Sequence, residues 1–317
     1  MSEFSNKFKK FDGFNLVFLW FKSGVLHYAI FWLLILGFSK KRLEILRLLI
    51  RDKIYRKLKK KYVKYINKSS YSNLESLGSN KVWVCWYQGI ENAPEIVKVC
   101  YSSLVNNLKD KEIVLLTEKN INSFVQIPEF ILEKRRKGII SDTHFSDILR
   151  VELLIKHGGA WIDATVLCTG SHFPKSFFES DLFLFQNLKP GKDGHSLNIS
   201  SWFIAAKSNN KVLLHTRELL HEYWKNKNYL VDYFLFHYFV QIVLDELPRE
   251  YNKIPCAPNS TPHILLFELF HEFEEERFSH ISNMTSFHKL SYKFDGTLKD
   301  KEHTNYQKLL NSNKDNA

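Results

Sequence analysis

One acidic residue interrupts an apolar segment near the middle of the chain. Asp163 lies within residues 160–167, whose composition predicts a β-strand. Burial of an isolated carboxylate is costly, so this aspartate is either a cap for a nearby loop or part of a ligand site. Side chains alternate along a strand, so Trp161, Asp163 and Thr165 are expected on one side. That side would offer a carboxylate and a hydroxyl to a ligand.

A second pair of charged residues precedes this strand. Asp147 and Arg150 are three residues apart within residues 146–157, where apolar residues recur at helical spacing. Both side chains are therefore expected on one face of a helix. The pair could be an ordinary surface ion pair, which would contribute only a few tenths of a kcal/mol. Alternatively, the helix leads through a Gly-Gly pair to Asp163 and brings all three charges into one site for sugar hydroxyls and a diphosphate.

The segments around these residues alternate between strand and helix patterns. Strands are predicted at residues 82–87, 112–117, 160–167, 182–185 and 202–206, and helices at residues 93–107, 146–157, 211–225 and 231–247. Such alternation is typical of an α/β domain with a largely parallel sheet. Ligand sites of such domains gather at the ends of the strands, which is where Asp163 is expected.

Length and composition exclude several classes of protein. The chain has 317 residues, of which 44% are hydrophobic and 15% aromatic, with 12 Gly and 8 Pro. These values exclude collagen-like, disordered and small disulfide-rich proteins, and they leave one large or two small domains. Cys85, Cys100, Cys168 and Cys256 form no CxxC pair, so we interpret them as reduced packing residues without a zinc site.

The net charge of +11 is concentrated at the N-terminus. Residues 1–68 contain 17 of the 45 Lys and Arg and 4 of the 34 Asp and Glu, which leaves 28 basic and 30 acidic residues in the rest. A protein that binds nucleic acid would usually carry positive charge on its main domain too, so nucleic acid is not expected as a partner. We divide the chain into a helical arm (1–68), a linker (69–80), a main domain (81–297) and a polar tail (298–317) that should fray.

The arm combines an apolar segment with a basic amphipathic helix. Residues 14–38 are strongly apolar but interrupted by Lys22 and His27, and they could span a membrane once only if Lys22 reached a headgroup. No secretory cleavage site follows. Residues 40–66 carry one apolar stripe among basic residues. The stripe consists of Leu43, Leu46, Ile50, Ile54, Leu58, Tyr62 and Tyr65. This helix could pack on its own domain, but the apolar segment favours an anionic membrane surface, with the main domain in the cytoplasm.

Taken together, the motifs resemble those of known sugar-transferring enzymes. Residues 146–163 follow the pattern SDxxRxxLL…GGxxxD. This pattern is similar to the signature of glycosyltransferase family 32 and, most closely, of the bacterial capsular polysaccharide synthesis proteins related to it. The large clostridial glucosylating toxins carry a similar version. Residues 82–89 resemble the first strand of these families, with its W-x-x-W-x-x-G ending. The resemblance covers residues 81 to about 240 and leaves the arm outside.

The resemblance implies a GT-A fold, a Rossmann-like α/β domain, and an activity. The enzyme would move a sugar from a UDP- or GDP-sugar donor to a glycan or lipid-linked acceptor in capsular or surface polysaccharide assembly. Family 32 enzymes retain the anomeric configuration, so retention is implied here. By position, Asp147 and Arg150 match residues that contact donor sugar hydroxyls and phosphate. Trp86 and Gln88 fall near the expected nucleobase.

The same resemblance assigns a metal to Asp163, which matches the first carboxylate of a DxD element that binds ribose and a divalent ion. The second carboxylate is replaced by Thr165, so the motif reads Asp-Ala-Thr. A hydroxyl is a weaker, neutral ligand for Mn²⁺ or Mg²⁺, which prefer carboxylate oxygens. The capsular proteins resembled here tolerate this version. The expected cofactor is therefore Mn²⁺ or Mg²⁺, while the motif leaves the metal requirement open.

Two alternatives remain at this point. A toxin-like transferase that glycosylates protein side chains would use the same donor site. A membrane-docking scaffold whose sugar site has decayed would also fit, with Thr165 as the relic.

Other polar and aromatic residues are interpreted as structural. Asp232 and His237 are five residues apart, a poor helical pairing, and are expected in the core or the pocket wall. His144 could reach the pocket or cap the helix, and Trp202 is expected to pack rather than to stack on a sugar.

Overall fold

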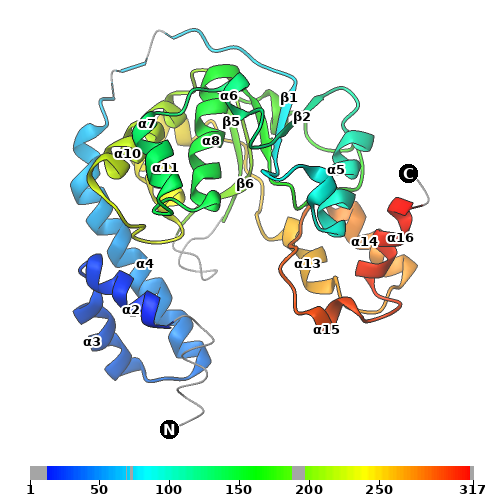
Figure 1. Cartoon of the computed structure of the whole chain (residues 1–317), viewed down its shortest axis with the longest axis horizontal. Helices are drawn as coiled ribbons and strands as arrows, with labels where there is room; N and C mark the ends of the chain where they lie inside the picture. The colour runs from blue at the N-terminus through cyan, green and yellow to red at the C-terminus, as the bar shows by residue number, and fades with distance from the viewer. Residues whose placement is uncertain (1–12, 69, 72–73, 188–196, 315–317) are drawn as a thin grey trace.

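A five-stranded sheet lies at the centre of the computed structural model, which describes residues 13–68, 70–71, 74–187 and 197–314 (Figure 1). The strands are β1 (Lys81–Cys85), β2 (Glu112–Leu116), β3 (Gly159–Ile162), β5 (Leu182–Gln186) and β6 (Ile199–Ala206). Their order is β2-β1-β3-β6-β5. β1 is parallel to β2 and β3, and β6 is antiparallel to both β3 and β5. The predicted α/β class with a largely parallel sheet is confirmed.

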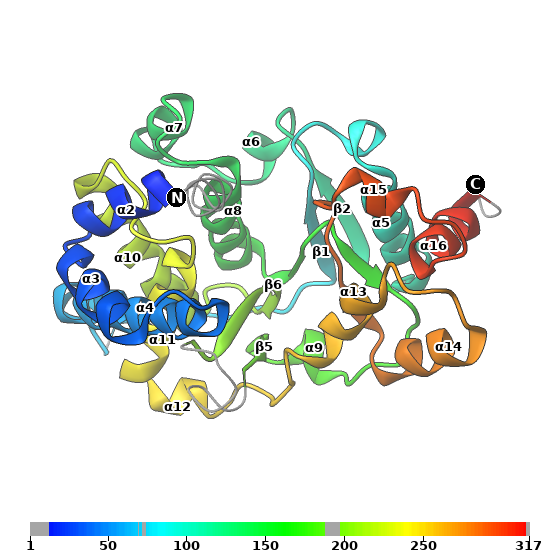
Figure 2. The same cartoon turned by 90° about the horizontal axis from the view of Figure 1, so that it is seen from below.

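Side chains of the strands alternate between two cores, one on each face of the sheet. Trp83 and Trp161 enter one core, whereas Val82 and Ile162 enter the other. Helices cover both faces (Figures 1 and 2). On one side lie α4 (Lys40–Tyr62), α7 (Glu129–Arg136), α8 (Asp142–His157), α10 (Lys211–Asn226) and α11 (Leu235–Glu246), and on the other α5 (Glu95–Asn107), α13 (Ile264–Glu268), α14 (Glu275–Met284) and α16 (Asn305–Lys314). Burial on both faces explains why the strands read as nearly continuous apolar runs.

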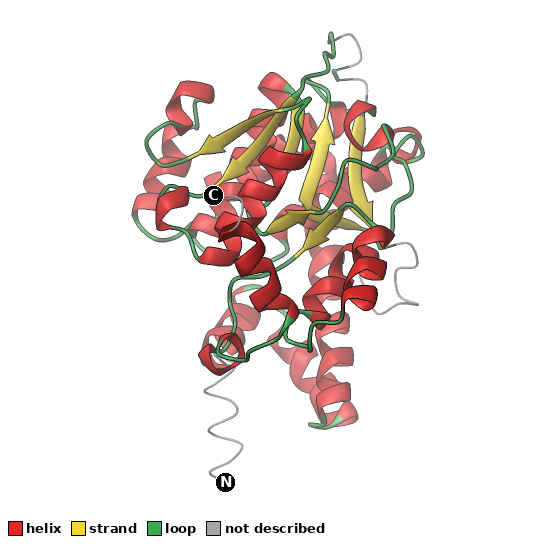
Figure 3. Ribbon diagram, turned by 90° about the vertical axis from the view of Figure 1, so that its right-hand side faces the viewer, coloured by secondary structure: helices red, strands yellow, loops and turns green. Residues whose placement is uncertain are grey.

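Short elements connect these layers. They are α6 (Ile121–Phe124), α9 (Ser176–Glu179), α12 (Pro248–Tyr251), α15 (Gly296–Lys299), and the strands β4 (Val166–Cys168) and β7 (Phe287–Lys289), which form a separate antiparallel pair (Figure 3). All four cysteines are free. Cys100 and Cys168 are buried, as predicted for packing residues, whereas Cys256 is exposed, so the packing prediction is wrong for it.

The Gly-Gly pair between α8 and β3 allows a close approach that sets the position of β3. Gly158 and Gly159 have φ values of +67° and +92°, which L side chains rarely adopt. A Cβ on Gly159 would lie 2.3 Å from the carbonyl oxygen of Lys81 at the start of β1. The pair therefore lets the chain reverse from α8 into β3 directly beside β1, and this reversal brings the end of β3 near the beginning of α8.

The predicted strand over residues 160–167 is divided in two. β3 ends at Ile162, and the Asp163 backbone N–H donates to the Trp202 carbonyl oxygen at 2.8 Å. The Val166 N–H then donates to the Asp163 carbonyl oxygen at 3.0 Å, which closes a turn before β4. The strand is therefore shorter than predicted, but the expected alternation holds: Ile162, Ala164 and Val166 are all buried in one core. Trp161, Asp163 and Thr165 line one cavity, as expected, although only 2% of the surface of Trp161 is exposed.

In its described residues the arm forms three α-helices, so residues 14–38 do not form one continuous helix. α2 (Gly13–Lys22) and α3 (Leu26–Leu36) are joined by a turn. The ammonium of Lys57, on α4, donates to the carbonyl oxygens of Ser23 and Gly24 in this turn, at 2.6 and 3.1 Å. Within the described part of the chain, no helix combines the length and apolar character needed to cross a membrane. Residues 1–12 of the predicted arm lie outside the described residues.

Most of the apolar stripe of α4 is buried inside the protein, against α3 and the main domain, and does not face a membrane as predicted. Leu46, Ile50, Ile54, Leu58 and Tyr62 are buried. The Tyr62 ring lies 5.1 Å from that of Phe239 on α11, and Lys59 forms a 2.8 Å ion pair with Asp245 at the end of the same helix. When α4 covers the apolar surface of α10 and α11, apolar area on both sides is removed from water. This burial makes the packed position of α4 more stable than a separated one. The alternative interpretation, a helix packed on its own domain, is therefore correct for these residues.

The tail and the linker are more ordered than predicted. α16 packs on α5 and buries Tyr306 and Leu309, so the expectation that the tail frays is wrong for its described residues, which end at 314. In the linker, the carbonyl oxygen of Leu77 accepts a 2.9 Å hydrogen bond from the Ser208 N–H. Residues 69, 72 and 73 of the predicted linker lie outside the described residues.

Candidate functional site

A cavity of about 930 Å³ opens where β1 and β3 end and α8 begins. Its wall is built from segments far apart in the sequence: the ends of β1 and β3, the start of β6, the first turns of α8 and α11, and the residues after β7. Arg51 of α4 also lines it, so the arm contributes to the wall. This is the edge of the sheet where the sequence predicts a ligand site.

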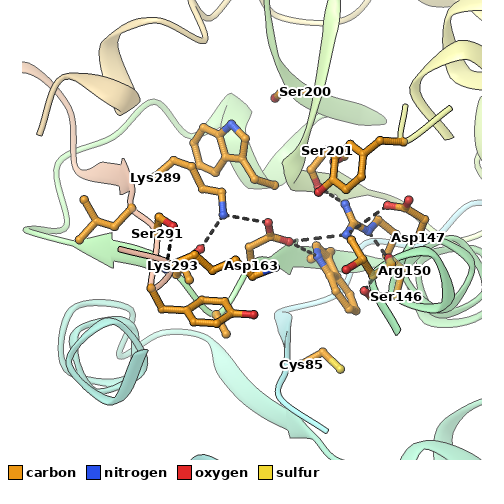
Figure 4. A pocket seen from close by; sticks show the side chains of 18 of the residues that line it. Cys85, Ser146, Asp147, Arg150, Asp163, Ser200, Ser201, Lys289, Ser291 and Lys293 are labelled. Atoms are coloured by element: carbon orange, nitrogen blue, oxygen red, sulfur yellow. Dashed lines mark hydrogen bonds and ion pairs between the residues drawn. The ribbon is translucent and has the colours of Figure 1, made fainter. Parts of the chain in front are cut away.

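The three charged residues singled out in the sequence meet in this cavity (Figure 4). A guanidinium nitrogen of Arg150 lies 3.3 Å from a carboxylate oxygen of Asp147 and 3.6 Å from one of Asp163. Asp147 and Arg150 are buried, with 6% and 5% of their surface exposed, whereas the Asp163 side chain is 28% exposed. The prediction that the helix brings the pair beside Asp163 is confirmed by these distances. Their contacts with a donor stay predictions.

Arg150 directs most of its donors into the protein. Its Nε–H donates to the Ser146 carbonyl oxygen at 3.3 Å, and a second N–H donates to the Ser201 carbonyl oxygen at the start of β6. The guanidinium also lies over the Trp161 ring, 4.9 Å from its centroid. Arg150 therefore holds the two aspartates and β6 in place, in addition to lining the cavity.

Asp163 is surrounded by groups that favour its charged form. It accepts a 2.9 Å hydrogen bond from the Trp161 indole N–H, and its other oxygen lies 3.1 Å from the ammonium of Lys289. Burial by itself would raise the pKa of Asp163, but the charges of Lys289 and Arg150 and these hydrogen bonds together lower it below its usual value. The carboxylate is thus ionised at neutral pH.

Lys289 is the main functional residue that sequence reasoning missed. Its ammonium donates to the Thr165 hydroxyl at 2.5 Å as well as contacting Asp163, and Tyr292 and Lys293 follow it in the same wall. The only signal was local: Ser286–Lys293 mixes aromatic and basic residues in a short, strand-like run. Nothing in the sequence pairs that run with β4, more than a hundred residues earlier.

Trp86 and Gln88 line the cavity at the end of β1, as expected from their predicted position near a nucleobase. The Trp86 ring packs edge-on against Tyr292, with centroids 5.2 Å apart and an interplanar angle of 82°. Because the two rings are in contact with each other, a flat ring could stack only on an outer face of this pair. Gln88 is exposed at the rim. Binding of a base by either residue stays a prediction.

His144, His237 and Trp202 mainly contact other parts of the protein. Ser141 rather than His144 caps α8, and the Nδ1 of His144 lies 3.3 Å from Asp147. His237 is in the cavity wall, and burial lowers its pKa to about 4, so its imidazole is neutral at pH 7. Trp202 stacks on Phe185 with centroids 4.5 Å apart, a packing contact as predicted, and it also lines the cavity.

The residues around Asp163 do not fit a divalent metal of the DxD kind. Such an ion would share Asp163 with the Lys289 ammonium, and like charges at this range repel. Thr165 offers one hydroxyl that already accepts a hydrogen bond from Lys289. Among the residues that the structure describes, no group of three or more His, Cys, Asp and Glu side chains could hold a metal ion. The Mn²⁺ or Mg²⁺ requirement stays a prediction that experiment must test.

Comparison with known proteins gives one family match. The family model described as "Capsular polysaccharide synthesis protein" matches residues 38–309. This match begins before α4, so the prediction that the arm lies outside the shared part is wrong for that helix. No curated protein matches. A solved structure titled "PaToxG Glycosyltransferase" is similar over 84% of this chain and 98% of that chain, with 15% identity and a TM-score of 0.37.

Proposed function

Because the chain belongs to the capsular polysaccharide synthesis protein family, we propose that it is a glycosyltransferase that moves a sugar from a nucleoside-diphosphate donor to a growing glycan. The observation that carries the proposal is the convergence of Asp147, Asp163 and Lys289 in one cavity of about 930 Å³. Carboxylates accept hydrogen bonds from sugar hydroxyls, and an ammonium binds phosphate. The volume is near the upper end of the range for small-molecule sites, which suits a ligand made of base, ribose, diphosphate and sugar.

In the proposed reaction, the bond between the anomeric carbon and the β-phosphate oxygen breaks, and its electron pair stays on that oxygen. An acceptor hydroxyl oxygen forms the new bond to the anomeric carbon, and the hydroxyl proton leaves with the nucleoside diphosphate or with solvent. Positive charge beside the diphosphate stabilises this leaving group. Asp147 and Asp163, fixed by Arg150, would orient the sugar and ribose hydroxyls. Retention of configuration, implied by the resemblance, is part of the proposal.

The arm supports a membrane-bound, lipid-linked acceptor at the cytoplasmic face. Six large apolar side chains of α2 and α3 are each about half or more exposed: Phe18, Phe21, Ile30, Phe31, Leu34 and Ile35. Lys40, Lys41 and Arg42 are exposed at the following helix start. Apolar side chains beside basic ones suit an anionic lipid surface, where the former enter the headgroup region and the latter contact phosphates. This end of the arm projects away from the sheet (Figure 1).

Donor binding tests the proposal. The full chain should be titrated with UDP, GDP and a panel of UDP- and GDP-sugars, with and without Mn²⁺, by calorimetry. We expect binding of one nucleotide class and slow hydrolysis of at least one of its sugars. Absence of binding and hydrolysis across the whole panel would contradict the proposal and would favour a decayed scaffold.

The acceptor is tested separately in a strain that lacks the gene. Loss of capsule or surface polysaccharide repeat units supports the proposed acceptor. Unchanged polysaccharide together with loss of glycans from proteins would instead support the protein-glycosylating alternative.

A further inference from the structure

We propose that Lys289 takes the place of the divalent ion of a DxD site and that its ammonium binds the donor diphosphate directly. This inference rests on the proposed function and specifies how the same cavity would hold the leaving group. It also gives Thr165 a role: the residue is the acceptor that orients Lys289, rather than the relic of a lost metal ligand.

The first argument is the position of the ammonium. The Lys289 nitrogen lies 3.1 Å from an Asp163 carboxylate oxygen (Figure 4) and 2.5 Å from the Thr165 hydroxyl oxygen. The ammonium is therefore between the two polar side chains of the Asp-Ala-Thr motif. A cation shared by the first and third residues of the motif is the arrangement expected of a metal ion there. An ammonium has three N–H donors, and these two contacts leave one for a phosphate oxygen. The side chain is 20% exposed, at the cavity wall.

The second argument is that the backbone holds Lys289 in this place. β7 pairs with β4 so that Lys289 is opposite Val166, and the Leu290 N–H donates to the Thr165 carbonyl oxygen at 2.9 Å. Phe287, two residues earlier, is fully buried. The lysine is therefore presented from a fixed strand at a fixed register with the motif, which reduces the cost of ordering a long side chain when a ligand binds.

The third argument is the distribution of positive charge. Arg150 is 5% exposed and directs its donors to two carbonyl oxygens and two aspartates, so it has little left for a diphosphate. The remaining N–H donor of the Lys289 ammonium is on the cavity side, and Lys293 lines the same wall. A transferred sugar leaves two negative phosphates behind, and these two ammonium groups can stabilise that charge without a metal ion.

Nucleotide binding in the presence of a chelator tests the proposal. The full chain is titrated with UDP and with GDP in excess EDTA and again in Mn²⁺. We expect the Kd of the preferred nucleotide to differ by less than about threefold between the two conditions. In Lys289→Met, that Kd should rise by about tenfold or more, the scale of one lost charged contact, while the Kd of the matching nucleoside, uridine or guanosine, stays unchanged.

Two variants control the comparison. Lys289→Arg keeps the charge and should lose less affinity than Lys289→Met. Lys98→Met removes a lysine on α5 whose side chain is 33% exposed and lies outside the cavity lining. Among its described contacts this lysine forms an ion pair only with Glu95, at 2.8 Å, so the variant should bind like the native chain. Thermal unfolding checks that each variant folds. If Lys289→Met does not fold, the EDTA comparison on the native chain decides alone.

The outcomes separate this proposal from the function on which it rests. Nucleotide binding that disappears in EDTA and returns with Mn²⁺ would overturn the role of Lys289 but leave the glycosyltransferase proposal intact. Native-like binding by a folded Lys289→Met would do the same. Absence of any binding of nucleotides or sugar nucleotides would overturn both.

Discussion

Arg150 is a buried cation whose contacts are mostly with the protein itself. Its guanidinium joins α8, β3 and β6 through Asp147, Asp163 and the Ser201 carbonyl group. Arg150→Ala would leave Asp147 buried without its cationic partner, a type of change that usually costs several kcal/mol. We expect the free energy of unfolding to fall by about 3 kcal/mol, measured by urea denaturation.

Arg136→Ala is the matched control, because that arginine is 62% exposed and pairs with Glu129 on the surface. It should change the free energy of unfolding by less than about 0.5 kcal/mol. Equal changes in the free energy of unfolding for the two substitutions would show that the contacts of Arg150 do not stabilise the fold as proposed.

At the residue scale, the sequence predicts the members of the site that share one continuous segment. Asp147, Arg150 and Asp163 belong to a helix, a Gly-Gly turn and a strand, and the periodicity of these elements is enough to bring them together. Lys289 cannot be predicted as a member of the site in this way, because its position depends on the pairing of β4 with β7, which is a tertiary contact. The alternation rule places Trp161, Asp163 and Thr165 on the cavity side correctly, but it does not predict the turn that interrupts the strand after Ile162.

At the scale of elements, α4 is joined to the main domain by its apolar stripe. Ile54 is 2% exposed, so Ile54→Ala should create a cavity between α4 and the domain. We expect the free energy of unfolding to fall by about 3 kcal/mol in a denaturation experiment. Ile45 lies on the same helix but is 47% exposed, and Ile45→Ala should cost less than about 0.5 kcal/mol. A similar cost for both would mean that the stripe is not packed.

β7 contains a buried histidine that makes stability depend on pH. His288 is 0% exposed, and burial lowers its pKa to about 4. The unfolded chain would bind its proton near pH 6.5, so the folded state loses stability as the pH falls from about 6.5 to about 4. Between pH 7 and 5 this histidine should account for about 2 kcal/mol of that loss. His237, whose pKa is also lowered to about 4, acts in the same direction.

His288→Gln tests this dependence by removing the titrating group. The fall in unfolding free energy between pH 7 and 5 should shrink by about 2 kcal/mol relative to the native chain. His280→Gln, an exposed histidine on α14, should leave the dependence unchanged. An identical pH profile for His288→Gln and the native chain would contradict the assignment.

Sequence patterns predict the elements better than their partners. The helix over residues 40–66 is found within a few residues of α4, because its 3.6-residue period is strong. The same period does not tell which surface the stripe contacts, because a membrane or the apolar sides of α10 and α11 could cover it equally well. α16 is not predicted for a different reason: its only buried apolar side chains among the described residues, Tyr306 and Leu309, are too few to indicate a packed helix in a polar segment.

At the scale of the whole molecule, α2 and α3 carry exposed apolar side chains that we expect to contact a membrane. Phe267 of α13, which is 75% exposed and far from them, serves as the control position. We expect the triple variant Phe31→Ser, Leu34→Ser and Ile35→Ser to lose most of its binding to vesicles that contain anionic lipid. Sedimentation measures the bound fraction, and high salt should weaken binding of the native chain as well. These positions are better targets than Lys57 and Lys59, which contact the arm turn and Asp245.

Phe267→Ser should sediment like the native chain. Vesicle binding by the triple variant at the native level would contradict the membrane role of α2 and α3, and neutral vesicles that bind the native chain equally well would contradict the role of the basic residues.

Asp163→Asn tests most directly whether the cavity is the donor site. The measurement is turnover of a sugar nucleotide by the native chain and by this variant. The substitution keeps the shape of the side chain but removes the charge that contacts Lys289 and Arg150. The rate of donor hydrolysis or transfer, measured at saturating donor, should fall by at least about a hundredfold in a folded variant. Full activity of folded, donor-saturated Asp163→Asn would contradict the claim and show that the chemistry takes place elsewhere.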